Sequence, residues 1–190
     1  MLTTFLAYFL IFLFTVTEGR LRKGQQAETL EAGASDRNST RRLGMVYSLI
    51  VLSLVLAPVL NYLAIGRILS AGAGWAGLVV AAGGVALRVW ANRILGEFYT
   101  RTLRVAENQP VVQNGPYRLI RHPGYLGSIL MWAGAGLATT NWIAVVVAVV
   151  TPLIAYHLRI EAEEAMLVDC LGQAYARYKG RTWRLIPFVY

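Results

Sequence analysis

The chain has 190 residues, of which 56% are hydrophobic and 15% are charged, and its mean hydropathy is +0.50. Soluble globular domains have a charged fraction nearer ~25%, so this composition argues against an ordinary soluble domain and favours a protein made for a lipid bilayer. We attribute the formal net charge of +8 to membrane topology and anionic headgroups, and we expect membrane lipid rather than nucleic acid as a partner. The single cysteine, Cys170, excludes an intramolecular disulfide framework.

Five apolar runs define the predicted membrane-spanning helices. They cover residues 2–17, 43–65, 75–90, 125–139 and 142–157. A helix needs ~20 residues to cross the hydrocarbon core, with about 17 as the lower bound, so the second run spans alone and the others need flanking residues. The fourth run is the weakest candidate. The sequence therefore predicts an all-α integral membrane protein with about five transmembrane helices.

Basic residues are concentrated in alternate loops. They follow the first run, follow the third run and fill the C-terminal tail, whereas Arg67 lies in a loop on the opposite side. The positive-inside rule makes the basic side cytoplasmic. Because basic residues follow the first run rather than precede it, we expect an uncleaved first span with its N-terminus outside. The basic loops then face the cytoplasm, at the inner or plasma membrane of a prokaryote or the endoplasmic reticulum of a eukaryote.

We divide the chain into two regions. Residues 1–66 hold the first two transmembrane helices and a polar cytoplasmic loop at 18–42. Residues 67–190 hold the functional core, with three spans, a loop at 93–124 and a C-terminal helix at 158–179. The last helix is predicted because apolar residues recur at three- and four-residue spacing beyond the fifth span.

The heptapeptide RHPGYLG at 121–127 places polar side chains at a predicted membrane boundary. His122 precedes a proline, which disfavours the α conformation, and Pro123 suits the first position of a helix. Free backbone N–H groups at such a helix start favour an anionic ligand group. Interfacial anchoring by Arg121, His122 and Tyr125 is the simpler interpretation of the heptapeptide taken alone.

An acidic cluster follows the fifth span. Arg159 and Glu163 stand four residues apart, which is also the spacing of an ordinary surface ion pair, and Glu164 adds a second carboxylate. A solvated helix surface is the simplest interpretation of such a cluster. Its position beside the bilayer favours a shared site with the heptapeptide.

The segment 115–127 (GPYRLIRHPGYLG), followed by 159–164 (RIEAEE) and 172–178 (GQAYARY), resembles the isoprenylcysteine carboxyl methyltransferase family. The resemblance runs from the third predicted span to the C-terminus. It implies transfer of a methyl group from S-adenosylmethionine to a lipophilic acceptor at the cytoplasmic face. By position it implies that the methyl donor is bound by Gln109, Pro110, Val111, Val112, Tyr117, His122, Pro123, Gly124, Tyr125 and Glu163.

The resemblance also implies that Arg159 contacts the acceptor. The chemistry of the residues agrees, because Glu163 and Glu164 can face the cationic groups of the donor and the start of the fourth span can face its carboxylate. A carboxylate acceptor is already ionised and needs no general base. Catalysis then requires a planar fork of N–H donors, such as a guanidinium, that holds the carboxylate in line with the methyl group. We expect Arg159 to supply this fork, with Arg121 as the second candidate, and we count Glu164 as a further candidate catalytic residue.

Several alternatives are compatible with the sequence. The acceptor favoured by the resemblance is a prenylated cysteine carboxylate, while a phospholipid amine, a phenolic lipid or a thiol would suit related membrane methyltransferases. A nicotinamide-dependent membrane reductase for sterol-like lipids has somewhat similar C-terminal motifs. A non-enzymatic scaffold or transporter component would leave the heptapeptide and the acidic pair without a joint purpose, and spans without internal charges argue against an ion pathway. No metal site is expected.

Overall fold

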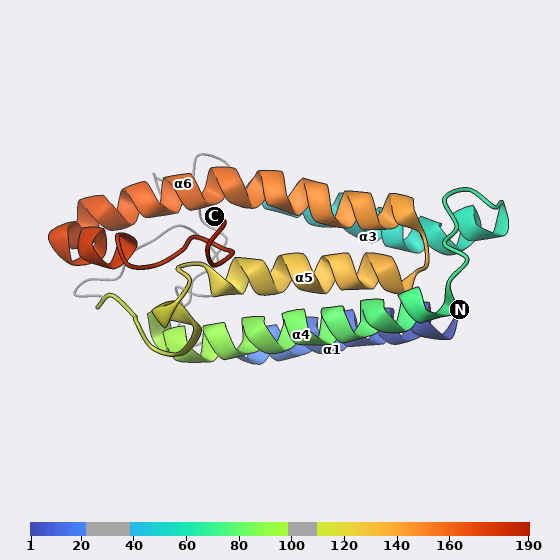
Figure 1. Cartoon of the computed structure of the whole chain (residues 1–190), viewed down its shortest axis with the longest axis horizontal. Helices are drawn as coiled ribbons and strands as arrows, with labels where there is room; N and C mark the ends of the chain where they lie inside the picture. Colours follow the sequence, from blue (N-terminus) through green and yellow to red (C-terminus); the bar gives the residue numbers. More distant parts are fainter. Residues whose placement is uncertain (22–38, 99–109) are drawn as a thin grey trace.

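A computed structural model describes residues 1–21, 39–98 and 110–190. These ranges form the α-helices α1 (Leu2–Leu21), α3 (Ser39–Tyr62), α4 (Ala71–Leu95), α5 (Pro123–Ala138) and α6 (Trp142–Lys179), with short 3-10 helices η2 (Gly96–Phe98) and η3 (Gly115–Arg118). The helices lie side by side in one elongated bundle (Figure 1). The all-α prediction is confirmed: the first four apolar runs each match one α-helix to within about five residues, and the fifth run forms the first part of α6.

Four of the described helices are long and apolar enough to cross a membrane, namely α1, α3, α4 and α6. The fourth predicted span corresponds to α5, which has 16 residues. At 1.5 Å per residue this helix is ~24 Å long, less than the ~30 Å hydrocarbon core. α5 runs along the middle of the bundle, between α4 and α6 (Figure 1). Its short length is tolerated because the longer helices shield it from lipid.

Glycines allow α4 and α5 to pack closely. A Cβ atom at Gly84 of α4 would lie 2.6 Å from the carbonyl oxygen of Gly127 of α5, and a Cβ at Gly127 would lie 2.7 Å from the carbonyl oxygen of Gly84. Gly134 makes the same approach to Gly77 one step further along. Small residues drive helix association in membranes because they permit such backbone contact. This close contact between the two helices therefore places the start of α5 beside the end of α4.

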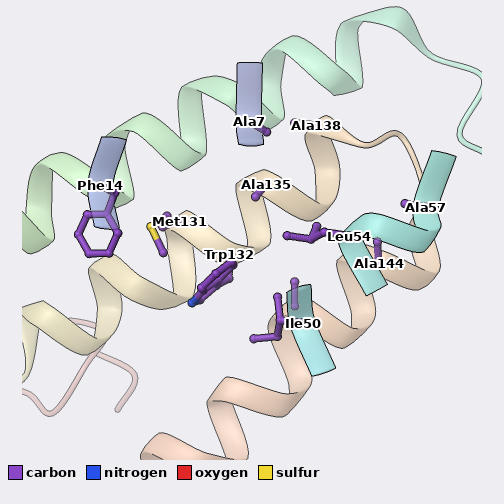
Figure 2. Packing of buried hydrophobic residues seen from close by; sticks show 11 residues of the cluster. Ala7, Phe14, Ile50, Leu54, Ala57, Met131, Trp132, Ala135, Ala138 and Ala144 are labelled. Carbon is purple, nitrogen blue, oxygen red and sulfur yellow. The ribbon is translucent and has the colours of Figure 1, made fainter. Parts of the chain in front are cut away.

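The apolar core joins α1, α3, α5 and α6 (Figure 2). Phe14 of α1, Ile50 and Leu54 of α3, and Trp132 of α5 are its large buried members. Alanines fill the narrow places between them, at positions 7, 57, 135, 138, 144 and 148. Outward-facing side chains of the same helices are large and apolar, as expected for a surface in lipid.

At the far end of α5, a tight turn at residues 139–141 leads into α6, so the two helices form a hairpin. Asn141 caps α6 by accepting hydrogen bonds from the backbone N–H groups of Ile143, at 3.0 Å, and Ala144, at 3.3 Å. Its own amide donates to the side chain of Asn61 at 2.8 Å and to the carbonyl of Ile65 at 2.9 Å. This end of the bundle is closed by fully paired amides.

α6 has 38 residues, and its uninterrupted part, 142–171, is ~45 Å long, which exceeds the ~30 Å hydrocarbon core. A non-helical residue, Gly172 with φ +57°, interrupts it, and the chain then resumes a helical path to Lys179. The tail returns to the start of α5: the Arg121 N–H donates to the Trp183 carbonyl at 2.7 Å, and the Trp183 N–H donates to the Leu119 carbonyl at 3.0 Å. The division into regions 1–66 and 67–190 stays a prediction.

Candidate active site

A cavity of about 450 Å³ opens where α4 ends and α5 begins. This volume falls within the range of ~300–1,000 Å³ that is typical of small-molecule sites. Residues from α1, α3, α4, α5 and α6 line it, together with Pro110, Val111 and Val112. The cavity therefore joins the apolar interior of the bundle to the polar segments beyond the spans.

Tyr125 lies at the centre of the polar wall. Arg159 Nε donates a hydrogen bond to the Tyr125 hydroxyl at 2.8 Å, and that hydroxyl donates to Glu163 Oε2 at 2.6 Å. The Tyr125 ring is stacked between two others, with its centroid 5.5 Å from that of His122 and 4.6 Å from that of Tyr156. The hydroxyl thus connects a cation and a carboxylate that stand one helical turn apart on α6.

Local sequence explains why these groups meet. Pro123 is the first residue of α5, and His122 precedes the helix with φ −122° and ψ 55°. Because proline presets its own φ and disfavours the α conformation before it, the helix must start here, as predicted. Among the described residues no side chain caps this start. Pro123 has no N–H, and the N–H groups of Tyr125 and Leu126 donate to the His122 carbonyl at 3.1 and 3.2 Å, which leaves the Gly124 N–H of this first turn for a ligand in the cavity.

Glu164 faces away from the cavity into an ion cluster. Its carboxylate is 2.7 Å from Arg121 Nε, 3.3 Å from His122 Nε2, 3.0 Å from Lys179 Nζ and 3.4 Å from Arg184 Nε. The residue is only 1% exposed. Burial raises the pKa of Glu164, but hydrogen bonds from His122, Arg121 and Lys179 outweigh burial and hold the pKa well below its ordinary value of 4.5.

Arg121 belongs to the same cluster. Besides its bond to Glu164, its guanidinium donates to the carbonyl of Lys179 at 3.1 Å and to the carbonyl of Thr182. These bonds tie the start of α5 to the C-terminal tail. Arg121 reaches the cavity lining, yet most of its donors are directed at protein groups.

The two C-terminal tyrosines of the 172–178 motif support the wall behind η3. The Tyr178 hydroxyl donates to the carbonyl of Tyr117 at 2.8 Å, which fixes η3 against the last turns of α6. Burial raises the pKa of Tyr178 to about 12, so this donor stays protonated at physiological pH. Tyr175 is buried and lines the cavity.

Most of the predicted site residues line the cavity: Pro110, Val111, Val112, Tyr117, Arg121, His122, Gly124, Tyr125, Arg159 and Glu163. Pro123 starts the helix without lining the cavity, and Glu164 lies behind the wall. Gln109 lies outside the described residues. The roles of all these residues as donor or acceptor contacts stay predictions.

Arg88 was missed by the sequence analysis. It lies on α4 inside the third predicted span, so the statement that the spans carry no charge is wrong. Its guanidinium donates to Ser128 Oγ at 2.6 Å, to the Gly124 carbonyl at 3.1 Å and to Glu18 Oε1 at 3.1 Å. An arginine within an apolar run is costly in lipid and marks a functional or structural site, and this signal was available in the sequence.

The fold and the site together define an all-helical membrane protein with a small-molecule cavity at the polar end of its spans. The sequence profile described as phospholipid methyltransferase matches residues 73–174, more than half of the chain. The chain belongs to this family.

Individual relatives agree with this assignment. The chain is 27% identical over 117 residues to the probable protein-S-isoprenylcysteine O-methyltransferase of Oryza sativa subsp. indica, covering 60% of this chain and 61% of the relative. It is 29% identical over 115 residues to protein-S-isoprenylcysteine O-methyltransferase B of Arabidopsis thaliana, covering 60% and 58%. It is 29% identical over 116 residues to the Rattus norvegicus protein-S-isoprenylcysteine O-methyltransferase, covering 60% and 41%.

A solved structure shares the fold. The eukaryotic intramembrane Ras methyltransferase ICMT (isoprenylcysteine carboxyl methyltransferase), solved without a monobody, matches with a TM-score of 0.60 and 24% identity. The match covers 79% of this chain and 52% of that structure. The chain thus spans about three fifths or less of the length of the relatives that it matches here.

Proposed function

We propose that this protein is an integral membrane methyltransferase that uses S-adenosylmethionine to methylate an anionic group on a lipophilic acceptor. The acceptor that fits best is the C-terminal carboxylate of an isoprenylcysteine. The observation that carries the proposal is the chain of hydrogen bonds from Arg159 through Tyr125 to Glu163 on the wall of one cavity. The names of the relatives support the same reaction class.

The residues present fit such a methyl donor. Its sulfonium and ammonium require a carboxylate, which Glu163 offers at the cavity wall. Its own carboxylate requires a donor, which the Gly124 N–H at the uncapped start of α5 offers. Val111, Val112 and Tyr117 provide an apolar and aromatic surface for a flat base. When bound, the donor supplies an electrophilic methyl group, which an ionised carboxylate can accept without a general base.

Arg159 is the residue we assign to the acceptor. It is only 4% exposed and sits one turn before Glu163, so a carboxylate held by its guanidinium lies next to the donor. A planar fork binds a carboxylate through two parallel hydrogen bonds and fixes its direction. Arg121 and Glu164 act as positioning residues, because their mutual bond holds the His122 segment against the tail.

The lipid part of the acceptor has a matching surface. The cavity has an apolar part lined by Ile11 and Phe14 of α1, Leu43 and Tyr47 of α3, and Trp132 of α5. An apolar chain buried there gains about 0.8 kcal/mol per methylene group. The donor and the acceptor thus reach the polar wall from opposite directions, one from the cytosol and one from the bilayer.

A second candidate acceptor is a phospholipid amine, favoured by the description of the family profile. A neutral amine has no use for a guanidinium, and it must lose a proton during the reaction. The buried position of Arg159 beside the proposed donor site therefore favours the anionic acceptor.

The test uses the full-length protein purified in detergent. Titration with S-adenosylhomocysteine measures the donor site, and methyl transfer is then measured with a farnesylated cysteine that has a free carboxylate and, separately, with phosphatidylethanolamine. We expect donor binding and transfer to the farnesylated cysteine. Methyl transfer to the phospholipid alone would contradict the carboxylate acceptor and assign a phospholipid amine in its place. Binding of a nicotinamide cofactor without binding of S-adenosylhomocysteine would overturn the proposal in favour of a reductase.

A further inference from the structure

Asn92 is a buried polar residue that the proposed reaction has not yet used. It lies on α4 one turn after Arg88 and is only 4% exposed. Within the described part of the chain its amide nitrogen has no hydrogen-bond partner, although the residue lines the cavity. A buried donor without a partner is unfavourable, and this cost is removed when a ligand atom accepts the bond.

The neighbours of Asn92 indicate which kind of ligand reaches it. Residues 88, 92 and 95 follow one another at four- and three-residue spacing, so Leu95 continues the same face of α4 toward η2. Beyond it, Phe98 and Val111 line the same cavity. The amide therefore lies on the loop side of Arg88, away from the apolar part lined by α1 and α3.

The start of α5 borders the amide on the other side. A Cβ atom at Gly124 would lie 3.6 Å from Asn92 Oδ1, which is ordinary contact. Gly124 belongs to the first turn of α5, beside the His122 and Tyr125 rings. Asn92 thus lies beside the start of α5, which we assign to the methyl donor, whereas Arg159 lines the same cavity from α6.

We propose that Asn92 binds the edge of the adenine base of the methyl donor. The base has two apolar faces, suited to the slot that includes Leu95, Phe98 and Val111, and an edge on which an amino donor adjoins a ring acceptor. A carboxamide carries the complementary acceptor and donor side by side, and asparagine pairs with adenine through two such bonds. This inference rests on the proposed function, and it adds a residue that selects adenine over other purines.

The test compares two ligands that differ only at this edge. On the N6/N7 edge, with which asparagine pairs, S-inosylhomocysteine has a carbonyl oxygen where S-adenosylhomocysteine has the amino group, so it presents two acceptors side by side, and neither orientation of the carboxamide satisfies both. We expect the wild-type protein to bind the adenosine compound roughly ten- to a hundredfold more tightly, because the inosine edge leaves the amide mispaired. In Asn92→Leu, affinity for the adenosine compound falls about tenfold and the preference between the two ligands disappears.

Two controls separate base recognition from folding. Gln113→Leu removes an exposed amide that does not line the cavity, and it retains the wild-type preference. Asn92→Ser keeps a small polar group, and with a thermal unfolding midpoint near that of wild type it provides a folded second variant if the leucine variant does not fold. Its preference between the ligands falls below that of wild type.

Two results would overturn the inference. One is a wild-type protein that binds both ligands equally, and the other is an Asn92→Leu variant that keeps the preference, whether both affinities are unchanged or both fall by the same factor. An unchanged donor affinity with a raised KM for the farnesylated acceptor would assign Asn92 to the acceptor instead. In each case the wild-type protein still binds S-adenosylhomocysteine, whereas failure of the proposed function would show as no binding at all.

Discussion

Glu163 and Glu164 are adjacent on α6, yet they lie in two different electrostatic regions. Glu163 is partly buried at the cavity wall and accepts a hydrogen bond from the Tyr125 hydroxyl. Glu164 is 1% exposed and is surrounded by Arg121, His122, Lys179 and Arg184. One acidic pair thus combines a carboxylate that lines the cavity, that of Glu163, with a carboxylate that stabilises the fold, that of Glu164. Side chains of neighbouring residues point ~100° apart on a helix, so the two carboxylates face different surroundings.

The largest effect is expected from Glu164→Gln. The substitution keeps the shape but leaves the guanidinium of Arg121 buried beside a neutral group, and breaking a buried ion pair in this way costs about 3–5 kcal/mol. The thermal unfolding midpoint should fall, and donor binding should fall with it because the His122 segment loses its support. Thermal unfolding in detergent measures the first effect. Glu161→Gln, at an exposed position on the same helix, should leave the midpoint unchanged.

The ion pair between Glu164 and Arg121 also predicts that the stability of the protein depends on pH. Since the folded pKa of Glu164 lies below the ordinary value of 4.5, its contribution is fully present above that pH and is lost as the pH falls toward the folded pKa. The difference in unfolding midpoint between wild type and Glu164→Gln should be constant from about pH 6 to 8 and should narrow below about pH 4.5. A difference that grows on acidification would contradict the ion cluster.

Glu163→Gln should weaken binding of the methyl donor without unfolding the protein. Loss of a charge-assisted contact costs about 1.5–3 kcal/mol, or roughly ten- to a hundredfold in affinity for S-adenosylhomocysteine. The unfolding midpoint should stay close to that of wild type, in contrast to Glu164→Gln. Calorimetric titration gives the affinity. If the affinity is unchanged, Glu163 is not part of the donor site.

The smallest effect on donor binding is expected from Arg159→Lys. This change keeps the charge but removes the planar fork, so methyl transfer to the farnesylated cysteine should fall while donor affinity changes less than tenfold. Both quantities are measured on one preparation. Equal losses would mean that Arg159 supports the donor site through Tyr125 rather than holding the acceptor. Full turnover at all acceptor concentrations would remove Arg159 from the site.

Local rules made part of this site predictable. The start of α5 at Pro123 follows from the conformational limits of proline, and the shared face of Arg159 and Glu163 follows from helical periodicity. The helices themselves were predictable because apolar runs of sufficient length have few other structures in a membrane. These features need no knowledge of how distant segments pack.

The separation of Glu163 from Glu164 depends on distant segments. Glu164 was predicted as a second acid for the donor, and its actual surroundings are set by a tail that returns to Arg121. Arg88 is visible as a charge within an apolar run, but its pairing with Glu18 was not predictable, because Glu18 stands 70 positions earlier, near the end of another helix. No periodicity within one segment indicates such pairings. They arise from tertiary contacts, which sequence patterns alone do not specify.

The return of the tail has a consequence for biosynthesis. The segment before α5 gains its backbone partners only when Trp183 and Arg184 dock onto it, and Glu164 gains two of its cations from Lys179 and Arg184. During synthesis on the ribosome, all five helices are made before these residues emerge. A nascent chain can therefore insert and pack these helices while its ligand site is still incomplete, so competence to bind follows their insertion.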